Sequence, residues 1–343
     1  MGIVTYNMVL NIFNVLIVNK LIRHILVVAF LSLNLVSLSS AKSKCSSKSN
    51  PDYLTITEAM ATLKIPEAAA KLNTGFGTSP ELPNPFRPPF TSIEPIKLFD
   101  RFYFVGTTSV GAYLAETDEG LVLFDTGSCD TDAALMVADM KKLGLDPSKI
   151  KLIFLSHEHF DHYGGVQYFK KNICPDAKVA MSLIGWNMLQ TVPLEGPYIG
   201  MRPQSVDIFL TDGMKIKVGE TIFQLVYTPG HSAGCMSFII SVADYGEPHV
   251  IGLMGGSAVW ATQLETRLYK SSIEYFKAFA EAAKCDIGLG FHYQEGNFLP
   301  LRLRKSGEKN PLVIGVEQFD TVYLKQFRDR YQGMLDSENV KPY

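Results

Sequence analysis

The stretch SHEHFDHYGG (156–165) constrains the fold and the chemistry of this chain more than any other feature. It places three of only 7 histidines within six positions of a 343-residue sequence. The apolar run KLIFLS (151–156) comes directly before it and is typical of a short buried strand. The three histidines are therefore expected just beyond the end of a core strand.

The spacing inside this stretch favours metal binding. Side chains two apart on an extended chain point the same way, so His157 and His159 are expected to converge on one point. Asp161 and His162 precede a glycine pair (164–165), where the chain is expected to turn. Adjacent side chains at such a turn reach a second point close to the first. The stretch therefore predicts ligands for two metal ions.

Two ring nitrogens do not complete a zinc site, which takes about four ligands including water. Two further histidines also follow predicted strands: His231 in TPGHSAG and His292 at the end of CDIGLGFH. The remaining two are His24, near the N-terminus, and His249, at a strand start, which we interpret as structural. A single histidine is more often structural than a ligand, but this cluster predicts a metal centre.

The chain around these motifs alternates strand-like and helix-like segments. Strands are predicted over 101–108, 111–118, 120–127 and 151–156, and then over 206–212, 214–219, 221–230, 235–242, 249–256 and 285–292. Amphipathic helices are predicted over 130–146, 271–284 and 316–335. Two halves of this kind predict an α/β fold, a four-layer αββα sandwich of two mixed β-sheets with helices on the outer faces.

The composition indicates which kinds of partner the protein can bind. The net charge of -2 gives no basic surface for nucleic acid, so we expect a small-molecule substrate and no nucleic-acid partner. The 5 cysteines are widely spaced and do not form a disulfide framework, although one or two bridges among them remain open.

The N-terminus predicts export. Residues 1–41 contain no acidic residue, and Lys20 and Arg23 precede an apolar run (25–38) that is followed by Ser-Ser-Ala. This is typical of a cleaved signal peptide, and hence of a periplasmic or secreted protein. The alternative is an uncleaved anchor, and only this segment would then contact a membrane. Residues 42–93 are expected to form an irregular arm with one short helix over 55–65, and the regular domain spans 94–343.

The motifs H-x-H-x-D-H and T-P-G-H, with a preceding strand that ends in FDTG, resemble the metallo-β-lactamase superfamily over about residues 94–335. The resemblance implies that residues 94–343 form a zinc-dependent hydrolase domain with the αββα fold. It also implies two Zn²⁺ per chain, the first held by His157, His159 and His231 and the second by Asp161, His162 and His292. Asp125 would be a buried aspartate that organises the loops, or an ordinary turn residue. Glu158 does not indicate the diiron branch of the family, because His159 is present.

The segment LMGGSAVW (253–260) points to one branch of the superfamily. Glyoxalase II, lactonases and RNA-processing nucleases carry a metal-bridging Asp here, and this chain has none. Ser257 in this segment is similar to the third subclass of class B β-lactamases. The resemblance implies that a hydroxide between two zinc ions attacks the carbonyl of a β-lactam amide, with Asp161 orienting it. Ser257 would bind the substrate carboxylate or a zinc-bound water, or would only satisfy strand packing.

The substrate stays open at this point. Where related subclasses place a Lys or a second Ser for the β-lactam carboxylate, this chain has Trp260 and Val259. Candidates to replace them are Thr262, Tyr198, Tyr293 and Arg202. The alternatives are a hydrolase of lactones, thioesters or other esters and amides, and a non-catalytic metal-binding protein. The complete set of six ligands argues against the last.

Overall fold

The structure is a computed structural model that describes residues 52–62, 92–108, 110–191, 201–257, 262–296 and 298–336. The segment predicted to be a signal peptide and most of the predicted arm lie outside these residues, so both stay predictions. No helix in the described ranges is long and apolar enough to cross a membrane.

The first sheet has seven strands and carries most of the metal-site motif. Its order is β2 (Ile96–Phe99), β3 (Phe102–Gly106), β4 (Gly111–Thr117), β5 (Gly120–Phe124), β6 (Ile150–Phe154), β7 (Lys178–Ser182) and β8 (Ile208–Leu210). Strands β2 to β5 pair antiparallel, whereas β5 to β8 pair parallel. The carboxyl ends of β5 and β6 therefore meet at one edge of the sheet.

The second sheet has six strands. Its order is β1 (Leu54–Thr55), β9 (Lys215–Val218), β10 (Thr221–Tyr227), β11 (Met236–Asp244), β12 (Glu247–Met254) and β13 (Ile287–Gly290). The outermost pairs, β1 with β9 and β12 with β13, are parallel, and the others are antiparallel. Both sheets are thus mixed, as predicted.

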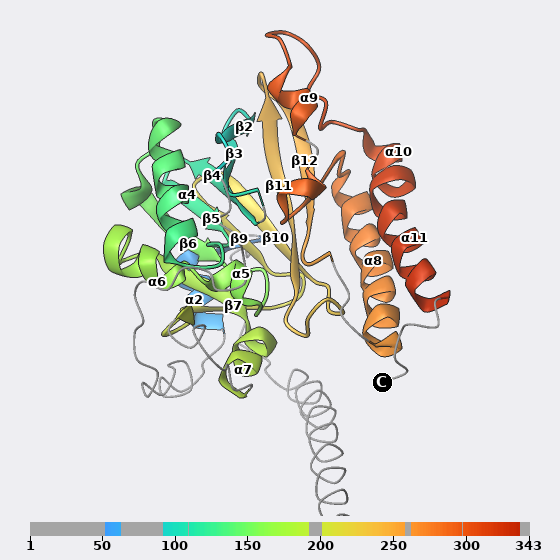
Figure 1. Ribbon diagram of the computed structural model, residues 1–343, viewed down its shortest axis with the longest axis horizontal. Coiled ribbons are helices and arrows are strands. Elements are labelled where there is room, and N and C mark those ends of the chain that lie inside the picture. The colour runs from blue at the N-terminus through green and yellow to red at the C-terminus, as the bar shows by residue number, and fades with distance from the viewer. Residues whose placement is uncertain are drawn as a thin grey trace, which may run out of the picture. The chain divides into compact units, whose positions relative to one another are not determined.

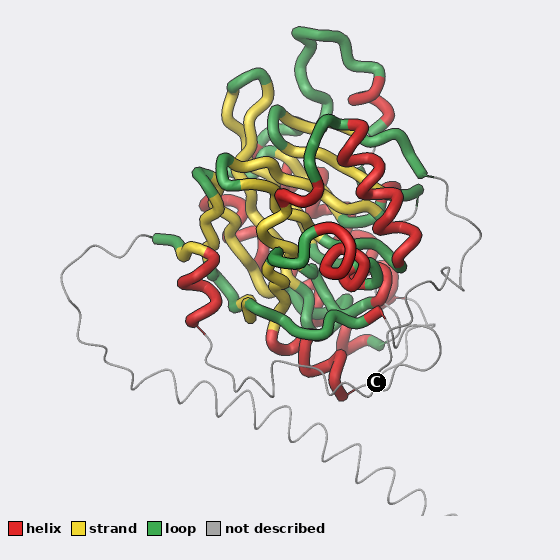
Figure 2. Tube along the Cα trace, turned by 90° about the vertical axis from the view of Figure 1, so that its left-hand side faces the viewer, coloured by secondary structure: helices red, strands yellow, loops and turns green. Residues whose placement is uncertain are grey.

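Helices cover the outer faces of both sheets (Figures 1 and 2). On the seven-stranded sheet lie α4 (Asp130–Lys142), α5 (Phe160–Tyr163), α6 (Val166–Tyr168), η2 (Phe169–Ile173) and α7 (Leu183–Thr191). On the six-stranded sheet lie α8 (Gln263–Ala283), η5 (Phe319–Leu324) and α11 (Lys325–Asp336). Shorter elements are α2 (Ile56–Thr62), η1 (Pro147–Lys149), η4 (Tyr293–Glu295), α9 (Leu299–Arg302) and α10 (Val316–Gln318).

Apolar side chains fill three layers, one between the two sheets and one between each sheet and its helices. On β5, Phe124 packs between the sheets and Leu123 packs under the helices, because successive side chains of a strand point to opposite faces. Between the sheets, Phe124 and Phe154 of one sheet contact Phe223 and Phe238 of the other, with ring centroids 5.2–5.8 Å apart. The αββα sandwich predicted from the sequence is confirmed.

Several predicted boundaries are wrong for local reasons. Helix α8 begins at Gln263 rather than at 271, because Thr262 and Glu265 form a capping box at its start. Helix α7 forms where the sequence predicted no regular element, and Trp186 on it is fully buried in the core. A short helix, α2, does form inside the predicted arm, and β1 before it joins the second sheet. The four described cysteines are buried, and no disulfide joins any two of them.

Candidate metal centre

The side chains singled out in the sequence follow the carboxyl ends of four strands. Asp125 follows β5, the H-x-H-x-D-H segment (157–162) follows β6, His231 follows β10 and His292 follows β13. A backbone hydrogen bond from Met236 N to Ser156 O, 2.9 Å long, joins the two sheets at this edge. The sandwich therefore brings loops from both sheets to one place.

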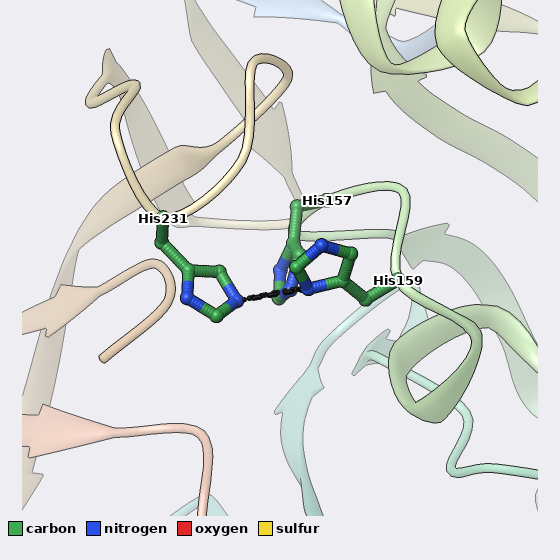
Figure 3. A group of neighbouring side chains, drawn as sticks. All are labelled: His157, His159 and His231. Atoms are coloured by element: carbon green, nitrogen blue, oxygen red, sulfur yellow. Dashed lines mark hydrogen bonds between the residues drawn. The ribbon is translucent and has the colours of Figure 1, made fainter. Parts of the chain in front are cut away.

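The first group consists of His157, His159 and His231, whose rings converge (Figure 3). His157 Nε2 lies 3.1 Å from His159 Nδ1 and 3.0 Å from His231 Nε2. The distance between His159 Nδ1 and His231 Nε2 is 3.0 Å. His157 and His159 thus converge as the spacing of the motif predicts, and His231 completes a nearly equilateral triangle of ring nitrogens.

The second group consists of Asp161, His162 and His292. His162 Nε2 lies 3.6 Å from Asp161 Oδ2, and the rings of His162 and His292 have centroids 5.5 Å apart. His157 and His162 link the two groups, because their ring centroids are only 4.0 Å apart. The two candidate sites therefore lie side by side.

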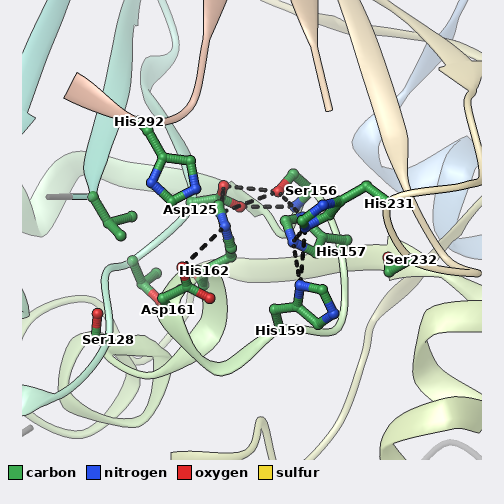
Figure 4. Close-up of polar contacts among 12 residues, drawn as sticks. Asp125, Ser128, Ser156, His157, His159, Asp161, His162, His231, Ser232 and His292 are labelled. Atoms are coloured by element: carbon green, nitrogen blue, oxygen red, sulfur yellow. Dashed lines mark hydrogen bonds and ion pairs between the residues drawn. The ribbon is translucent and has the colours of Figure 1, made fainter. Parts of the chain in front are cut away.

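Asp125 connects both groups (Figure 4). One carboxylate accepts hydrogen bonds from Ser156 N at 2.7 Å, Ser156 Oγ at 2.8 Å and His162 Nδ1 at 2.7 Å. Because the Ser156 hydroxyl donates to Asp125, it is free to accept from His157 Nδ1, 2.9 Å away. This chain of bonds fixes both rings so that each presents Nε2 to its group. Asp125 is fully buried and organises the loops rather than only ending a strand.

Burial and neighbouring charges set the protonation of the ligands. Burial lowers the pKa of His157 well below its usual value, and that of His159 to about 4. Burial also lowers the pKa of His162, but the charges of Asp161 and Asp125 outweigh it and the net shift is upward. For Asp161 burial raises the pKa, and the nearby histidines reverse this to a net lowering. At neutral pH His157 and His159 are therefore neutral, and Asp161 is a carboxylate.

This donor set fits zinc. His162 Nε2 is buried and has no hydrogen-bond partner in the structure, so a cation would satisfy an otherwise orphaned lone pair. Three nitrogens bound to zinc at about 2.0–2.1 Å in a tetrahedral arrangement lie roughly 3.3 Å apart, close to the spacing of the first group. Three imidazoles, or two with a carboxylate, are ligand sets of catalytic zinc sites, which leave one position open.

Ser257 follows β12, and its neighbour Gly256 packs against His231, since a Cβ on Gly256 would lie 2.4 Å from His231 Cδ2. It is buried, and its carbonyl accepts hydrogen bonds from Arg330 Nη1 at 3.1 Å and from the Tyr331 hydroxyl, both on α11. The Tyr269 hydroxyl of α8 donates to Gly256 O. The sequence alone did not predict that these two helices hold the segment that carries Ser257.

The candidate substrate anchors are mostly engaged elsewhere. The Thr262 hydroxyl forms the capping box of α8, and Arg202 is 2% exposed. Tyr293 is half-buried and packs against Phe104 and Phe298, with centroids 5.8 Å from each. Tyr198, Val259 and Trp260 lie outside the described residues. His249 contacts Asp286 at 2.6 Å, in agreement with its structural interpretation.

Two mixed sheets face to face, with paired histidine and aspartate groups beyond their strand ends, define a metal-binding αββα protein. Residues 105–245 match the model of the metallo-beta-lactamase superfamily. The resemblance inferred from the motifs is thus confirmed, and fold and family together indicate a zinc-dependent hydrolase.

Solved structures with the same fold cover most of the chain. BJP-1 of Bradyrhizobium japonicum, a subclass B3 metallo-beta-lactamase, is 25% identical, covers 72% of this chain and 95% of its own, and has a TM-score of 0.62. The FEZ-1 metallo-beta-lactamase of Legionella gormanii is also 25% identical, with 73% and 98% covered and a TM-score of 0.62.

A curated relative matches a shorter segment. An N-acyl homoserine lactonase of Bacillus thuringiensis is 27% identical over 161 residues, which are 40% of this chain and 60% of the lactonase. The match thus spans less than two thirds of that relative.

Proposed function

We propose that the protein is a dinuclear zinc hydrolase that opens the amide of a β-lactam. The observation that carries the proposal is the pair of adjacent ligand groups, with His157 and His162 centroids 4.0 Å apart, and no Asp between Leu253 and Ser257. The likeness to subclass B3 enzymes over 72–73% of the chain supports it.

Each group would hold one zinc ion. The nitrogens of His157, His159 and His231 would bind the first, and Asp161, His162 and His292 the second. Zinc supplies a Lewis acid that polarises a carbonyl and makes water acidic enough to attack at neutral pH.

The chain's own residues would orient the reactants. The Asp161 carboxylate would position the attacking water through its second oxygen while it binds metal, because its lowered pKa keeps it ionised. The Asp125 carboxylate would hold His162, and through Ser156 also His157, in the tautomers that ligation needs. Ser257 would hydrogen-bond the substrate carboxylate, since it follows Gly256, which packs against His231, and its backbone is held by α11.

Hydrolysis of a lactone is the second candidate. It is favoured by the match to the N-acyl homoserine lactonase, which is 27% identical over 161 residues. A lactone carbonyl is attacked by the same chemistry as a β-lactam carbonyl, so the metal ligands do not distinguish the two.

Purified, zinc-loaded protein should be assayed against a carbapenem, a penicillin, an acyl homoserine lactone and a thioester. Turnover of a β-lactam that is lost in His157→Ala supports the first candidate. Turnover of the lactone alone supports the second. If zinc binds and none of the substrates is hydrolysed, the hydrolase proposal fails and a non-catalytic metal-binding protein is favoured.

We also propose that the protein is exported after removal of residues 1–41. Support comes from the absence of acidic residues there, the basic residues Lys20 and Arg23, and the apolar run before Ser-Ser-Ala. Expression in a Gram-negative host, fractionation and N-terminal sequencing test this. A start near residue 42 in the periplasmic fraction supports cleavage, and an intact N-terminus in the membrane fraction would support an anchor instead.

A further inference from the structure

Glu158 stands between two candidate ligands in the sequence, yet its carboxylate binds another loop. Oε2 accepts a hydrogen bond from the Ser232 hydroxyl at 2.9 Å. Gly234 N donates to Oε1 and Oε2, both at 3.1 Å. Ser232 is the neighbour of His231, so the carboxylate joins the H-x-H-x-D-H segment directly to the loop that supplies the third histidine.

The loop packs closely around this carboxylate. A side chain on Gly234 would place its Cβ 2.5 Å from Glu158 Oε2 and 2.4 Å from the Cα of Gly185, the third residue of α7. Gly185 has the same constraint, since its Cβ would lie 3.3 Å from Glu158 Oε2. Only small residues allow helix, loop and carboxylate to approach in this way.

Burial of this carboxylate has a cost that the contacts must offset. The Glu158 side chain is partly buried, and Ser232 Oγ and Gly234 N donate to its carboxylate. A carboxylate that is shielded from water is tolerated when donors satisfy it, and both of these donors belong to one loop. The cost is thus offset only while that loop stays in place.

Three other hydrogen bonds of this loop do not reach the segment that carries His157 and His159. Thr228 N bonds Cys235 O at 3.0 Å and Gly230 N bonds Ser232 O at 3.1 Å, both within the loop. Ser182 Oγ donates to Gly234 O at 2.7 Å and ties the loop to the start of α7. At the end of the loop Met236 N bonds Ser156 O through the backbone, and Glu158 adds a side-chain link to the loop itself.

We infer that Glu158 is a positioning residue of the three-histidine group, which holds the His231 loop at the distance that His157 and His159 require. The inference rests on the proposed zinc centre. It predicts that loss of the carboxylate weakens zinc binding at this group, because His231 Nε2 no longer stays within 3.0 Å of the other two nitrogens.

The test uses a His292→Ala background, in which the three-histidine group is the complete one that remains. Zinc affinity is measured by competition with a chromophoric chelator for this background and for Glu158→Ala, Glu158→Gln and Ser232→Ala within it. We expect about a tenfold loss or more for Glu158→Ala, a smaller loss for the isosteric Glu158→Gln and the smallest for Ser232→Ala. The matched control is Asp139→Asn, a buried carboxylate that accepts from Gly106 N at 3.3 Å in another part of the fold.

Two further readouts separate positioning from general stability. The melting temperature of the metal-free protein reports packing alone, and the visible spectrum of the cobalt-substituted protein reports ligand geometry. Glu158→Ala should change the spectrum, whereas Asp139→Asn should lower only the melting temperature. Unchanged affinity and spectrum in Glu158→Ala overturn the inference. If Glu158→Ala does not fold, unchanged affinity in Glu158→Gln and Ser232→Ala overturns it. A background that binds no zinc overturns the proposed centre itself.

Discussion

The carboxylate of Asp125 accepts a hydrogen bond from His162 Nδ1 over 2.7 Å. Nε2 of the same ring has no hydrogen-bond partner and lies 3.6 Å from Asp161 Oδ2. One bond therefore fixes the tautomer and the direction of a candidate ligand. Asp125 also adopts a left-handed backbone, with φ of 64°, which is costly for a residue with a side chain. The bonds to Ser156 and His162 stabilise this conformation.

Replacement of Asp125 by Asn tests that relationship. The amide has one acceptor oxygen in place of two, so it cannot accept both from Ser156 N, which bonds Oδ1, and from Ser156 Oγ and His162 Nδ1, which bond Oδ2. We expect zinc affinity to fall by about 10–100-fold, because partners of metal-bound histidines have effects of this size. Equilibrium dialysis followed by elemental analysis measures it. An Asp125→Asn protein that keeps both zinc ions with wild-type affinity would contradict the role given to Asp125.

Replacement of Gly256 by Ala should displace a candidate ligand without touching its side chain. Gly256 has φ of 67°, and a Cβ there would lie 2.4–2.6 Å from His231 Cδ2, Cγ and Cβ. We expect the variant to lose zinc from the three-histidine group, measured as metal content per chain.

Gly246 offers a matched control for that experiment. It also has a positive φ, 83°, but no atom lies within 4 Å of its Cβ position. Gly246→Ala should cost about 1 kcal/mol of backbone strain and leave metal content unchanged. Equal losses of zinc in both variants would mean that strain, rather than contact with His231, is responsible.

The sequence predicted the six candidate ligands because strand ends and short-range spacing place them. His157 and His159 are two residues apart after an apolar strand, and this suffices to predict their convergence. The supporting bonds could not be read in the same way. Ser156 and Asp125 are 31 residues apart, and nothing in either segment shows that their side chains meet. Glu158 was interpreted only by its place between ligands, because its partner loop lies more than 70 residues away.

The two sheets and their helix layers could be predicted from local sequence patterns, as the ligands could. The start of α8 and the burial of Trp186 could not be predicted correctly in this way. Alternating apolar residues identified most strands, and two facing sheets follow from their number. The start of α8 was predicted eight residues late, although Thr262 and Glu265 carry a capping signal that the sequence contains. The burial of Trp186 on α7 depends on packing against the first sheet, which no local pattern around residue 186 reveals.

Replacement of Tyr331 by Phe should loosen the turn that carries Ser257. The hydroxyl donates to Ser257 O, and its loss leaves Arg330 Nη1 at 3.1 Å as the remaining donor to that carbonyl. We expect about 1 kcal/mol lower stability in urea unfolding. Tyr275→Phe is the control, since the Tyr275 side chain is exposed and its hydroxyl bonds Asp212 at 2.6 Å rather than Ser257. If the two variants lose equal stability, the α11 contact has no special part in holding the turn.

The pair of Asp244 and Arg304 should make stability depend on pH in the acid range. Arg304 Nη1 and Nη2 donate to the two Asp244 oxygens at 2.8 and 2.7 Å. The Arg304 side chain is only 10% exposed and that of Asp244 only 13%. The hydrogen bond from Arg304 is the main cause that lowers the pKa of Asp244 below its usual value. A lowered folded pKa means that the unfolded chain binds more protons. The stabilisation is therefore complete above the unfolded pKa near 4 and is lost as pH falls through the folded pKa.

Asp244→Asn should accordingly cost about 1–2 kcal/mol at pH 7, since a hydrogen-bonded ion pair is broken. The difference from wild type should shrink as the pH falls below about 4, where the wild-type carboxyl is itself protonated. Urea unfolding of both metal-free proteins at pH 7 and near pH 3 measures this. Asp118→Asn is the control, because its partner Arg101 and Asp118 itself are 44% and 64% exposed, and such pairs contribute little. A cost for Asp244→Asn that is the same at both pH values would show that the charge of Asp244 does not stabilise the fold.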